Sequence, residues 1–243
     1  MDDRVQGIAR RLDADPGVAG VVAFGPFLLQ AAQRRIEKNG SPLQLSARAF
    51  DILVTLIEQA GTVVSKDDGP RPGTNYETVS QLKPVFRPDG TITAGNACPL
   101  NDGAAAVVVM SDTKARELGL TPLARVVSTA VTGLSPEIMG YGPVEASKLA
   151  LQRAGMSIGD IDLVEINEAF AAQVIPSYRD LGIDIDRLNV HGGAIAVGHP
   201  FGMTGARITG TLINNLQTYD KTFGVESMCV GGGMGMAMVI ERL

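Results

Sequence analysis

Two glycine-rich stretches, each carrying a chemically active side chain, constrain this 243-residue chain most strongly. The first is N-V-H-G-G-A-I-A-V-G-H-P-F-G, from Asn189 to Gly202, and the second is C-V-G-G-G-M-G, which begins at Cys229. Glycine lets the backbone approach a ligand closely and turn at positive φ, while imidazole and thiol groups are readily tuned to exchange protons near neutral pH. The two stretches together predict acid/base or acyl-transfer chemistry.

Composition and charge exclude several classes of protein. The net charge of −5 disfavours a non-specific surface for nucleic acid or anionic membrane. The start M-D-D-R-V-Q-G lacks a basic region followed by an apolar core, and no apolar run approaches the ~20 residues that cross a bilayer. The two cysteines, Cys98 and Cys229, argue against a disulfide scaffold and suit a reducing compartment. We expect a globular protein of the cytoplasm without membrane association.

The first 67 residues read as a segment of their own. Short apolar stretches between Val21 and Leu45 alternate with turn signals, and Asn39-Gly40 is typical of a hairpin, so we expect a small β-meander. A helix is predicted after Ser46, because Phe50, Leu53, Leu56 and Ile57 share one helical face and Gly61 can end it.

This segment resembles the start of a winged-helix DNA-binding domain of the response-regulator type, in the strings F-G-P-F, L-S-A-R-A-F-D-I-L and G-T-V-V-S-K. In that family a recognition helix and a β-hairpin wing follow, and the helix reads the bases. Here D-D-G-P-R-P-G follows Lys66 instead, so the resemblance is to a truncated domain and DNA binding is disfavoured. Arg34, Arg35 and Lys38 are more readily explained as a solvated face than as phosphate contacts.

The rest of the chain has the pattern of a layered α/β protein. Residues 68–92 are rich in Pro, Gly and polar residues, which indicates a loop-dominated connection. A helix around Asp102–Ala106, a strand near Ala105–Met110 and a helix over Ser111–Leu118 are predicted next. From Ala124 onward strands and helices alternate, which favours helices covering a mixed sheet.

The two glycine-rich stretches, together with N-E-A-F from Asn167, resemble the C-terminal catalytic motifs of the thiolase family, the acyl-CoA C-acyltransferases. The resemblance covers about Gly69 to Leu243. It implies a layered α-β-α-β-α fold, with 68–92 as a remnant of the loop domain. Residues 93–120 would be the last strand and helix of the N-terminal domain, and 121–243 the complete C-terminal domain.

The resemblance also implies roles for four residues. His199 would activate a nucleophilic cysteine and contribute to the oxyanion hole, and Cys229 would be the acid/base that exchanges a proton with the methyl group of acetyl-CoA. Asn167 would hold an oxyanion-hole water, and Gly231 would supply a backbone donor. From the residues alone, a buried structural histidine, an inert cysteine and a helix N-cap asparagine are the alternatives. No metal site and no tightly bound cofactor are expected, with coenzyme A as co-substrate.

Two positions and one unmatched motif qualify this interpretation. His191 stands where thiolases usually have Asn, and Cys98 is expected to pack rather than react. The family's nucleophilic cysteine belongs to the N-terminal half; nothing upstream of Gly69 matches its motif, and no cysteine precedes Cys98.

We therefore interpret the chain as a thiolase-like acyltransferase for 3-oxoacyl-CoA and acetyl-CoA that is inactive alone. A truncated DNA-binding regulator and a non-catalytic partner of an intact thiolase are the alternatives. Association with itself or with a thiolase is expected.

Overall fold

The computed structural model describes residues 10–11, 21–24, 27–30, 35–38, 41–43, 71 and 73–243. The chain divides into two compact units, Met1–Asp68 and Gly69–Leu243, which are described separately. No helix within these described ranges is long and apolar enough to cross a membrane.

The first unit contains an antiparallel sheet in the order β1-β2-β3-β4-β5. Each strand pairs with the next along the chain, which confirms the predicted meander. Lys38 pairs with Ser41, so β4 and β5 form the hairpin expected around Asn39-Gly40. The helix predicted after Ser46 lies outside the described residues. The strands are β1 (Arg10–Arg11), β2 (Val21–Phe24), β3 (Phe27–Gln30), β4 (Arg35–Lys38) and β5 (Ser41–Leu43).

The second unit begins with loops and two short helices, α2 (Tyr76–Ser80) and α3 (Asp112–Glu117). The Ser111 side chain accepts a hydrogen bond from the Lys114 N–H, which confirms the predicted cap of α3. The strand and helix predicted between 102 and 110 are wrong, because this stretch has no regular structure and is exposed. Val108, for example, is 84% exposed. A strand is stable only when its backbone groups pair with a neighbour, and no described strand pairs with this stretch.

A mixed four-stranded sheet forms the centre of the second unit, in the order β6-β9-β8-β7. Strand β7 pairs with β8 in parallel, whereas β8 with β9 and β9 with β6 are antiparallel. The last two strands of the chain therefore occupy the middle of the sheet. The strands are β6 (Ala124–Gly133), β7 (Leu163–Ile166), β8 (Phe223–Val230) and β9 (Met234–Arg242).

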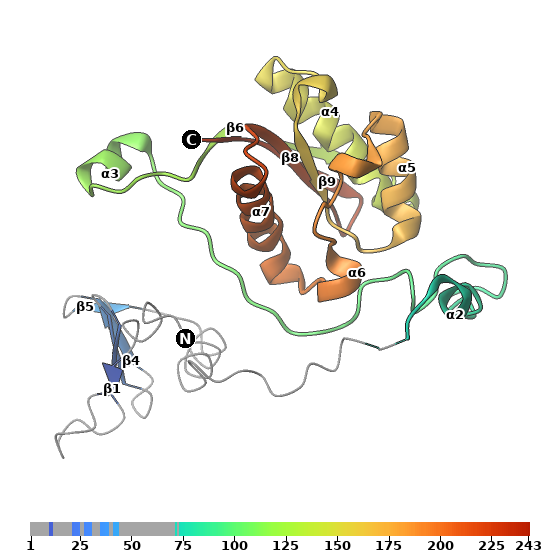
Figure 1. Ribbon diagram of the computed structural model, residues 1–243, viewed down its shortest axis with the longest axis horizontal. Helices are drawn as coiled ribbons and strands as arrows, with labels where there is room; N and C mark the ends of the chain where they lie inside the picture. Colours follow the sequence, from blue (N-terminus) through green and yellow to red (C-terminus); the bar gives the residue numbers. More distant parts are fainter. Residues whose placement is uncertain are drawn as a thin grey trace. The chain divides into compact units, whose positions relative to one another are not determined.

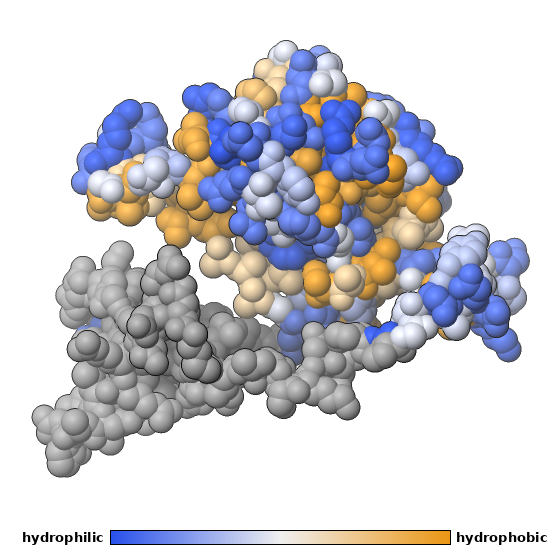
Figure 2. Space-filling model, viewed as in Figure 1, coloured by the Kyte–Doolittle hydropathy of each residue, from blue (hydrophilic) through white to orange (hydrophobic). Residues whose placement is uncertain are grey.

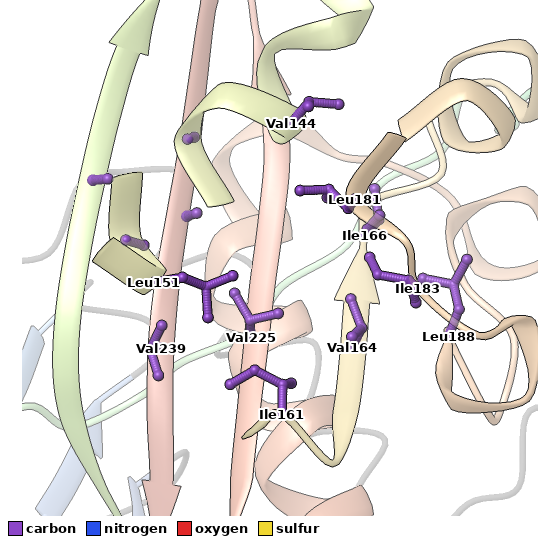
Figure 3. Close-up of a cluster of buried hydrophobic side chains, with 14 of the residues drawn as sticks. Val144, Leu151, Ile161, Val164, Ile166, Leu181, Ile183, Leu188, Val225 and Val239 are labelled. Atoms are coloured by element: carbon purple, nitrogen blue, oxygen red, sulfur yellow. The ribbon is translucent and has the colours of Figure 1, made fainter. Parts of the chain in front are cut away.

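Helices cover the two faces of this sheet, with α4 (Gly142–Ala154) and α5 (Ala171–Leu181) on one face and α7 (Phe201–Thr218) on the other (Figure 1). Neighbouring residues of β7 point to opposite faces, as a strand requires: Val164 joins the cluster under α4 and α5, while Leu163 packs against α7. Figure 3 shows the larger cluster, in which Leu151, Val225 and Val239 lie side by side. These elements confirm the predicted alternation. The short elements are η2 (Pro136–Tyr141), η3 (Ile158–Asp160), η4 (Ile185–Arg187) and α6 (Ala194–Val197).

Apolar residues remain on the surface of the second unit. Figure 2 shows them as patches among polar residues on the face in view. Val126 and Val131 of β6 are exposed, and so are Met234 and Met236 of β9. Part of the sheet is thus left without a covering helix among the described residues.

Candidate functional site

His199 lies in the loop between α6 and α7, one residue before the Pro200 N-cap of α7. Its Nδ1 is 2.6 Å from the Thr204 hydroxyl, which itself donates to the Pro200 carbonyl at 3.0 Å. A hydroxyl has a single proton to donate, so it must accept from Nδ1–H of the imidazole. This contact selects the tautomer in which Nε2 is free to accept a proton.

The surroundings of His199 keep its imidazole neutral. Burial lowers the pKa of His199, and the positive charge of Arg207 lowers it further. The Phe201 ring packs edge-on against the imidazole, with ring centroids 5.0 Å apart. Burial is the largest contribution to the lowered pKa of His199.

Asn167 directly follows β7 and is only 1% exposed. Its backbone N–H donates to the Ser227 carbonyl at 2.9 Å, and its Oδ1 accepts from Nη2 of Arg207 at 2.9 Å. Its Nδ2 has no hydrogen-bond partner. The alternative of a helix N-cap is wrong, because α5 begins at Ala171 and Phe170 is its N-cap.

Cys229 lies near the end of β8 and is 7% exposed. Burial raises the pKa of its thiol, and the nearby Cys98 acts in the same direction against a backbone hydrogen bond that lowers it. A thiol in this environment is protonated at neutral pH and is suited to donate a proton rather than to attack as a thiolate.

The glycines after Cys229 form the turn between β8 and β9. Gly231 is exposed in this turn, and its role as a backbone donor stays a prediction. Gly233 has φ +90°, and a side chain there would overlap the Leu134 carbonyl oxygen. The position in this turn where another backbone segment comes too close for a side chain is therefore Gly233, not Gly231.

Glu168 organises the first glycine-rich stretch. Its two carboxylate oxygens accept from Nδ2 of Asn189 at 2.8 Å and from the Ile195 N–H at 3.1 Å. A Cβ on Gly193 would lie 2.6 Å from the Glu168 carboxyl carbon, so this stretch needs glycine to approach the carboxylate. The Asn189 amide in turn bonds both the N–H and the carbonyl of Ile166, which fixes the stretch to the end of β7.

His191 and Cys98 take no part in the hydrogen bonds described above. His191 is exposed, and its Nε2 is 3.1 Å from the hydroxyl of Tyr219. Cys98 is half-buried, its N–H donates to the Ala169 carbonyl at 3.1 Å, and burial raises its pKa. Within the described residues, no group of three or more His, Cys, Asp or Glu side chains could hold a metal ion.

Two of the four predicted site residues are connected by a residue that sequence reasoning missed. Arg207 donates to Asn167, and its charge acts on His199. Cys229 lies on β8 two residues after Ser227, whose carbonyl accepts from the Asn167 N–H. The i,i+3 spacing of Thr204 and Arg207 in G-M-T-G-A-R is the signal that both face the same side of α7.

Comparison with protein families agrees with this arrangement. The model described as "Thiolase, C-terminal domain" matches residues 120–242, and "Thiolase, N-terminal domain" matches residues 46–113. The chain belongs to the thiolase family. The N-terminal match begins 23 residues before the expected start at Gly69 and lies partly within the segment compared with a winged helix. The comparisons therefore do not support the winged-helix resemblance.

Individual relatives carry the same family names. The chain is 57% identical over 253 residues to a 3-ketoacyl-CoA thiolase of Klebsiella pneumoniae, covering 98% of this chain and 65% of the relative. It is 52% identical to an acetyl-CoA acetyltransferase of Paracoccus denitrificans, covering 78% of this chain and 49% of that relative. The thiolase chain thus spans between about half and two thirds of the length of these relatives.

Solved structures share the fold. The acetyl-CoA acetyltransferase of Bacillus anthracis matches with a TM-score of 0.71 and 49% identity, over 73% of this chain and 45% of that one. Human mitochondrial 3-ketoacyl-CoA thiolase, solved in complex with CoA, matches with a TM-score of 0.68 and 46% identity, over the same shares. The expected thiolase fold is thereby confirmed, and the second unit contributes a three-layered α-β-α part of it.

Proposed function

We propose that this thiolase chain provides the acid/base side of an acyl-transfer site for 3-oxoacyl-CoA and acetyl-CoA, with coenzyme A as co-substrate. The observation that carries the proposal is a pair of proton-transfer groups in their neutral forms: the His199 imidazole with a free Nε2, and the buried Cys229 thiol. The names of the relatives, 3-ketoacyl-CoA thiolase and acetyl-CoA acetyltransferase, support the substrate class.

In thiolysis, the bond between C2 and C3 of the 3-oxoacyl-CoA breaks. The acyl group passes first to a cysteine sulfur and then to the sulfur of CoA, while the electron pair of the broken bond stays on C2. Cys229 would donate its proton to C2, which releases acetyl-CoA, and in synthesis it would remove that proton again. The raised pKa of Cys229 suits a group that begins the step as an acid.

His199 and Asn167 would act on the other side of the reaction. Nε2 of His199 would take the proton from the attacking cysteine, because the Thr204 contact leaves that nitrogen unprotonated. The unpartnered Nδ2 of Asn167 and the N–H of Gly231 would donate hydrogen bonds, directly or through water, to the thioester oxygen as negative charge develops on it.

The nucleophile limits what the 243-residue chain does by itself. Its two cysteines are Cys98, which is half-buried with a raised pKa, and Cys229, to which the proposal gives the acid/base role. Loss of the nucleophile from such a site removes many orders of magnitude in rate. We therefore expect the chain alone to bind acyl-CoA without completing thiolysis.

A second candidate function, a non-catalytic subunit, is favoured by the exposed apolar stretch from Val107 to Met110. Val108 and Val109 are 84% and 79% exposed, and unpaired apolar backbone of this kind readily adds to the edge of another sheet. The proposed partner is a second copy of the chain or a thiolase subunit. Size-exclusion chromatography with light scattering tests this candidate, and a monodisperse monomer that binds no thiolase would contradict it.

The main proposal is tested by incubating the purified chain with acetoacetyl-CoA and CoA. Loss of acetoacetyl-CoA absorbance measures thiolysis, intact-mass spectrometry detects an acyl adduct, and calorimetry measures acetyl-CoA binding. We expect binding without turnover or adduct. Turnover that Cys229→Ala abolishes, with acetyl trapped on Cys98 or Cys229, would show that one of these cysteines is the nucleophile. Absence of acetyl-CoA binding by the folded chain would overturn the proposed substrate class.

A further inference from the structure

The face of the sheet that α7 covers carries ionisable side chains where apolar ones are the norm. Leu163, Glu165 and Asn167 alternate toward this face, as successive odd positions of a strand do. Glu226 of β8 is the direct partner of Glu165 in the parallel register, so the two carboxyl groups lie beside each other. They are 1% and 6% exposed.

Side chains from α7 meet these groups. Nδ2 of Asn215 donates to Glu165 at 3.1 Å, and the Thr209 hydroxyl donates to Glu226 at 2.9 Å. Each carboxyl group uses one oxygen in these contacts, and its second oxygen is buried without a partner. Arg207 lies among them, with an unpartnered Nε and with Nη2 on the Oδ1 of Asn167.

The chemistry of the guanidinium group fixes how the Asn167 amide points. Arginine has only hydrogen-bond donors, so the amide atom that faces it must be the oxygen. The amino group must then point away from Arg207, and it is buried without a partner. An unsatisfied buried donor is rare in folded proteins and requires a reason, which here would be a ligand or water that the donor is kept ready to hold.

We propose that Arg207 is a positioning residue that fixes the Asn167 amide with its amino group available to an acyl-CoA oxygen or its bound water, and that Glu165 and Glu226 hold Arg207 more firmly as they ionise. The inference rests on the proposed function, because that function makes Asn167 a site residue. Arg207 acts through Asn167 and does not itself touch the substrate.

The electrostatic surroundings of Arg207 agree with a held, charged group. Burial lowers the pKa of Arg207, and the carboxylates of Glu165, Glu168 and Glu226 oppose this when they are ionised. The charge of Arg207 also acts on His199 in the loop before α7. Burial raises the pKa values of Glu165 and Glu226 to about 8. The pair therefore keeps protons at neutral pH and gains negative charge beside Arg207 as the pH rises past 8.

The experiment follows the side-chain amide of Asn167 by NMR in chain labelled with nitrogen-15 asparagine, without substrate. The signal is assigned by its absence in Asn167→Asp. We expect two well-separated amide proton signals that titrate with a midpoint near the shared pKa of about 8. Arg207→Met should move the separation of the two signals toward that of a free asparagine side chain, whose two amide protons stay distinct because the C–N bond does not rotate freely. Arg153→Met is the matched control, because Arg153 bonds the Thr129 carbonyl on the other face of the sheet.

Two further variants keep the inference testable if Arg207→Met does not fold. Glu226→Gln should abolish or shift the titration of the Asn167 signal while Glu165 remains, and Arg207→Lys should partly restore the separation of the two amide protons. Unchanged Asn167 signals in every folded Arg207 variant, or a signal that does not titrate in the unmodified chain, would overturn the positioning role. Adding acetyl-CoA to the same sample distinguishes the positioning role of Arg207 from the proposed substrate class. If the Asn167 amide signals behave as expected but acetyl-CoA does not bind, the substrate class is contradicted and the positioning role is still supported.

Discussion

The hydroxyl of Thr204 lies 2.6 Å from Nδ1 of His199 and donates a hydrogen bond to the Pro200 carbonyl. This relay fixes which nitrogen of the imidazole is free. The contact joins the start of α7 to His199, just before the helix. The choice of tautomer therefore depends on formation of the first turn of α7.

Replacing Thr204 with Val removes the acceptor of Nδ1–H while keeping the shape of the side chain. We expect a loss of about 1 kcal/mol in the free energy of unfolding and a mixture of His199 tautomers. Nitrogen-15 shifts of the imidazole measure the tautomer ratio, and His191, the only other histidine, is the internal reference. Thr204→Ser should retain the single tautomer. An unchanged tautomer in Thr204→Val would show that the hydroxyl does not select it.

The buried carboxyl pair makes stability depend on pH. Glu165 and Glu226 have pKa values of about 8 in the folded chain against an ordinary value of 4.5, so the native state binds more protons than the unfolded state between these values. The stability they contribute is fully present below pH 4.5 and is lost as the pH rises through 8. Thermal melting at constant ionic strength should show this decline. In Glu226→Gln the decline should be roughly half as steep, since one of the two groups no longer titrates. Equal slopes in both chains would contradict this account.

The two cysteines should differ in reactivity toward a thiol reagent. Cys229 is 7% exposed and Cys98 is half-buried, and burial raises the pKa of both. Iodoacetamide at pH 7.5 should therefore label Cys98 first and Cys229 slowly, and denaturant should remove the difference. Peptide mass mapping over time measures both rates. Faster labelling of Cys229 than of Cys98 would mean that its thiol is neither shielded nor held protonated.

Replacing Gly235 or Gly210 with alanine should change the stability of the second unit in opposite directions. A Cβ on Gly235 would overlap the Gly142 carbonyl, where β9 meets the start of α4, so Gly235→Ala should lower the stability by about 1–3 kcal/mol. Gly210 lies within α7 with no atom within 4 Å of the position of a Cβ, so Gly210→Ala should raise it by about 0.5–1 kcal/mol. Denaturant unfolding of both variants tests the pair, and equal effects would refute the packing described.

The exposed stretch around Val108 and Val109 should promote association. Replacing both valines with lysine should reduce dimers and aggregates in light scattering while leaving the melting temperature within a few degrees, because neither side chain is buried. Lys148→Ala, at an exposed position of α4, is a control that should change neither. Persistent association of the double variant would place the contact surface elsewhere.

Patterns local to the second unit were enough to predict most of its elements. Helix α3 forms at the predicted position, and β6 to β9 with α4, α5 and α7 form the alternation predicted from Ala124 onward, because their partners lie within the same unit. Residues 105–110 have an equally apolar pattern but no strand to pair with among the described residues. The strand predicted from that pattern therefore does not form.

The candidate site was predicted less completely. His199 and Cys229 stand in strings that are specific by themselves, whereas Arg207 meets Asn167 across 40 positions of sequence. Such a contact depends on how α7 lies over the sheet, which no local spacing encodes. The facing of Glu165 and Glu226 likewise follows from strand order and register, because a shift by one residue would place one carboxyl on the opposite face.

The order of strands also determines when the sheet of the second unit can fold. Strand β6 pairs only with β9 and β7 pairs only with β8, within the described sheet. During synthesis both outer strands leave the ribosome before their partners, so β7 must wait for β8 and β6 must wait for β9. Folding of the sheet therefore closes long loops, and a chain cut short before Phe223 loses every strand pairing of the sheet rather than one edge of it.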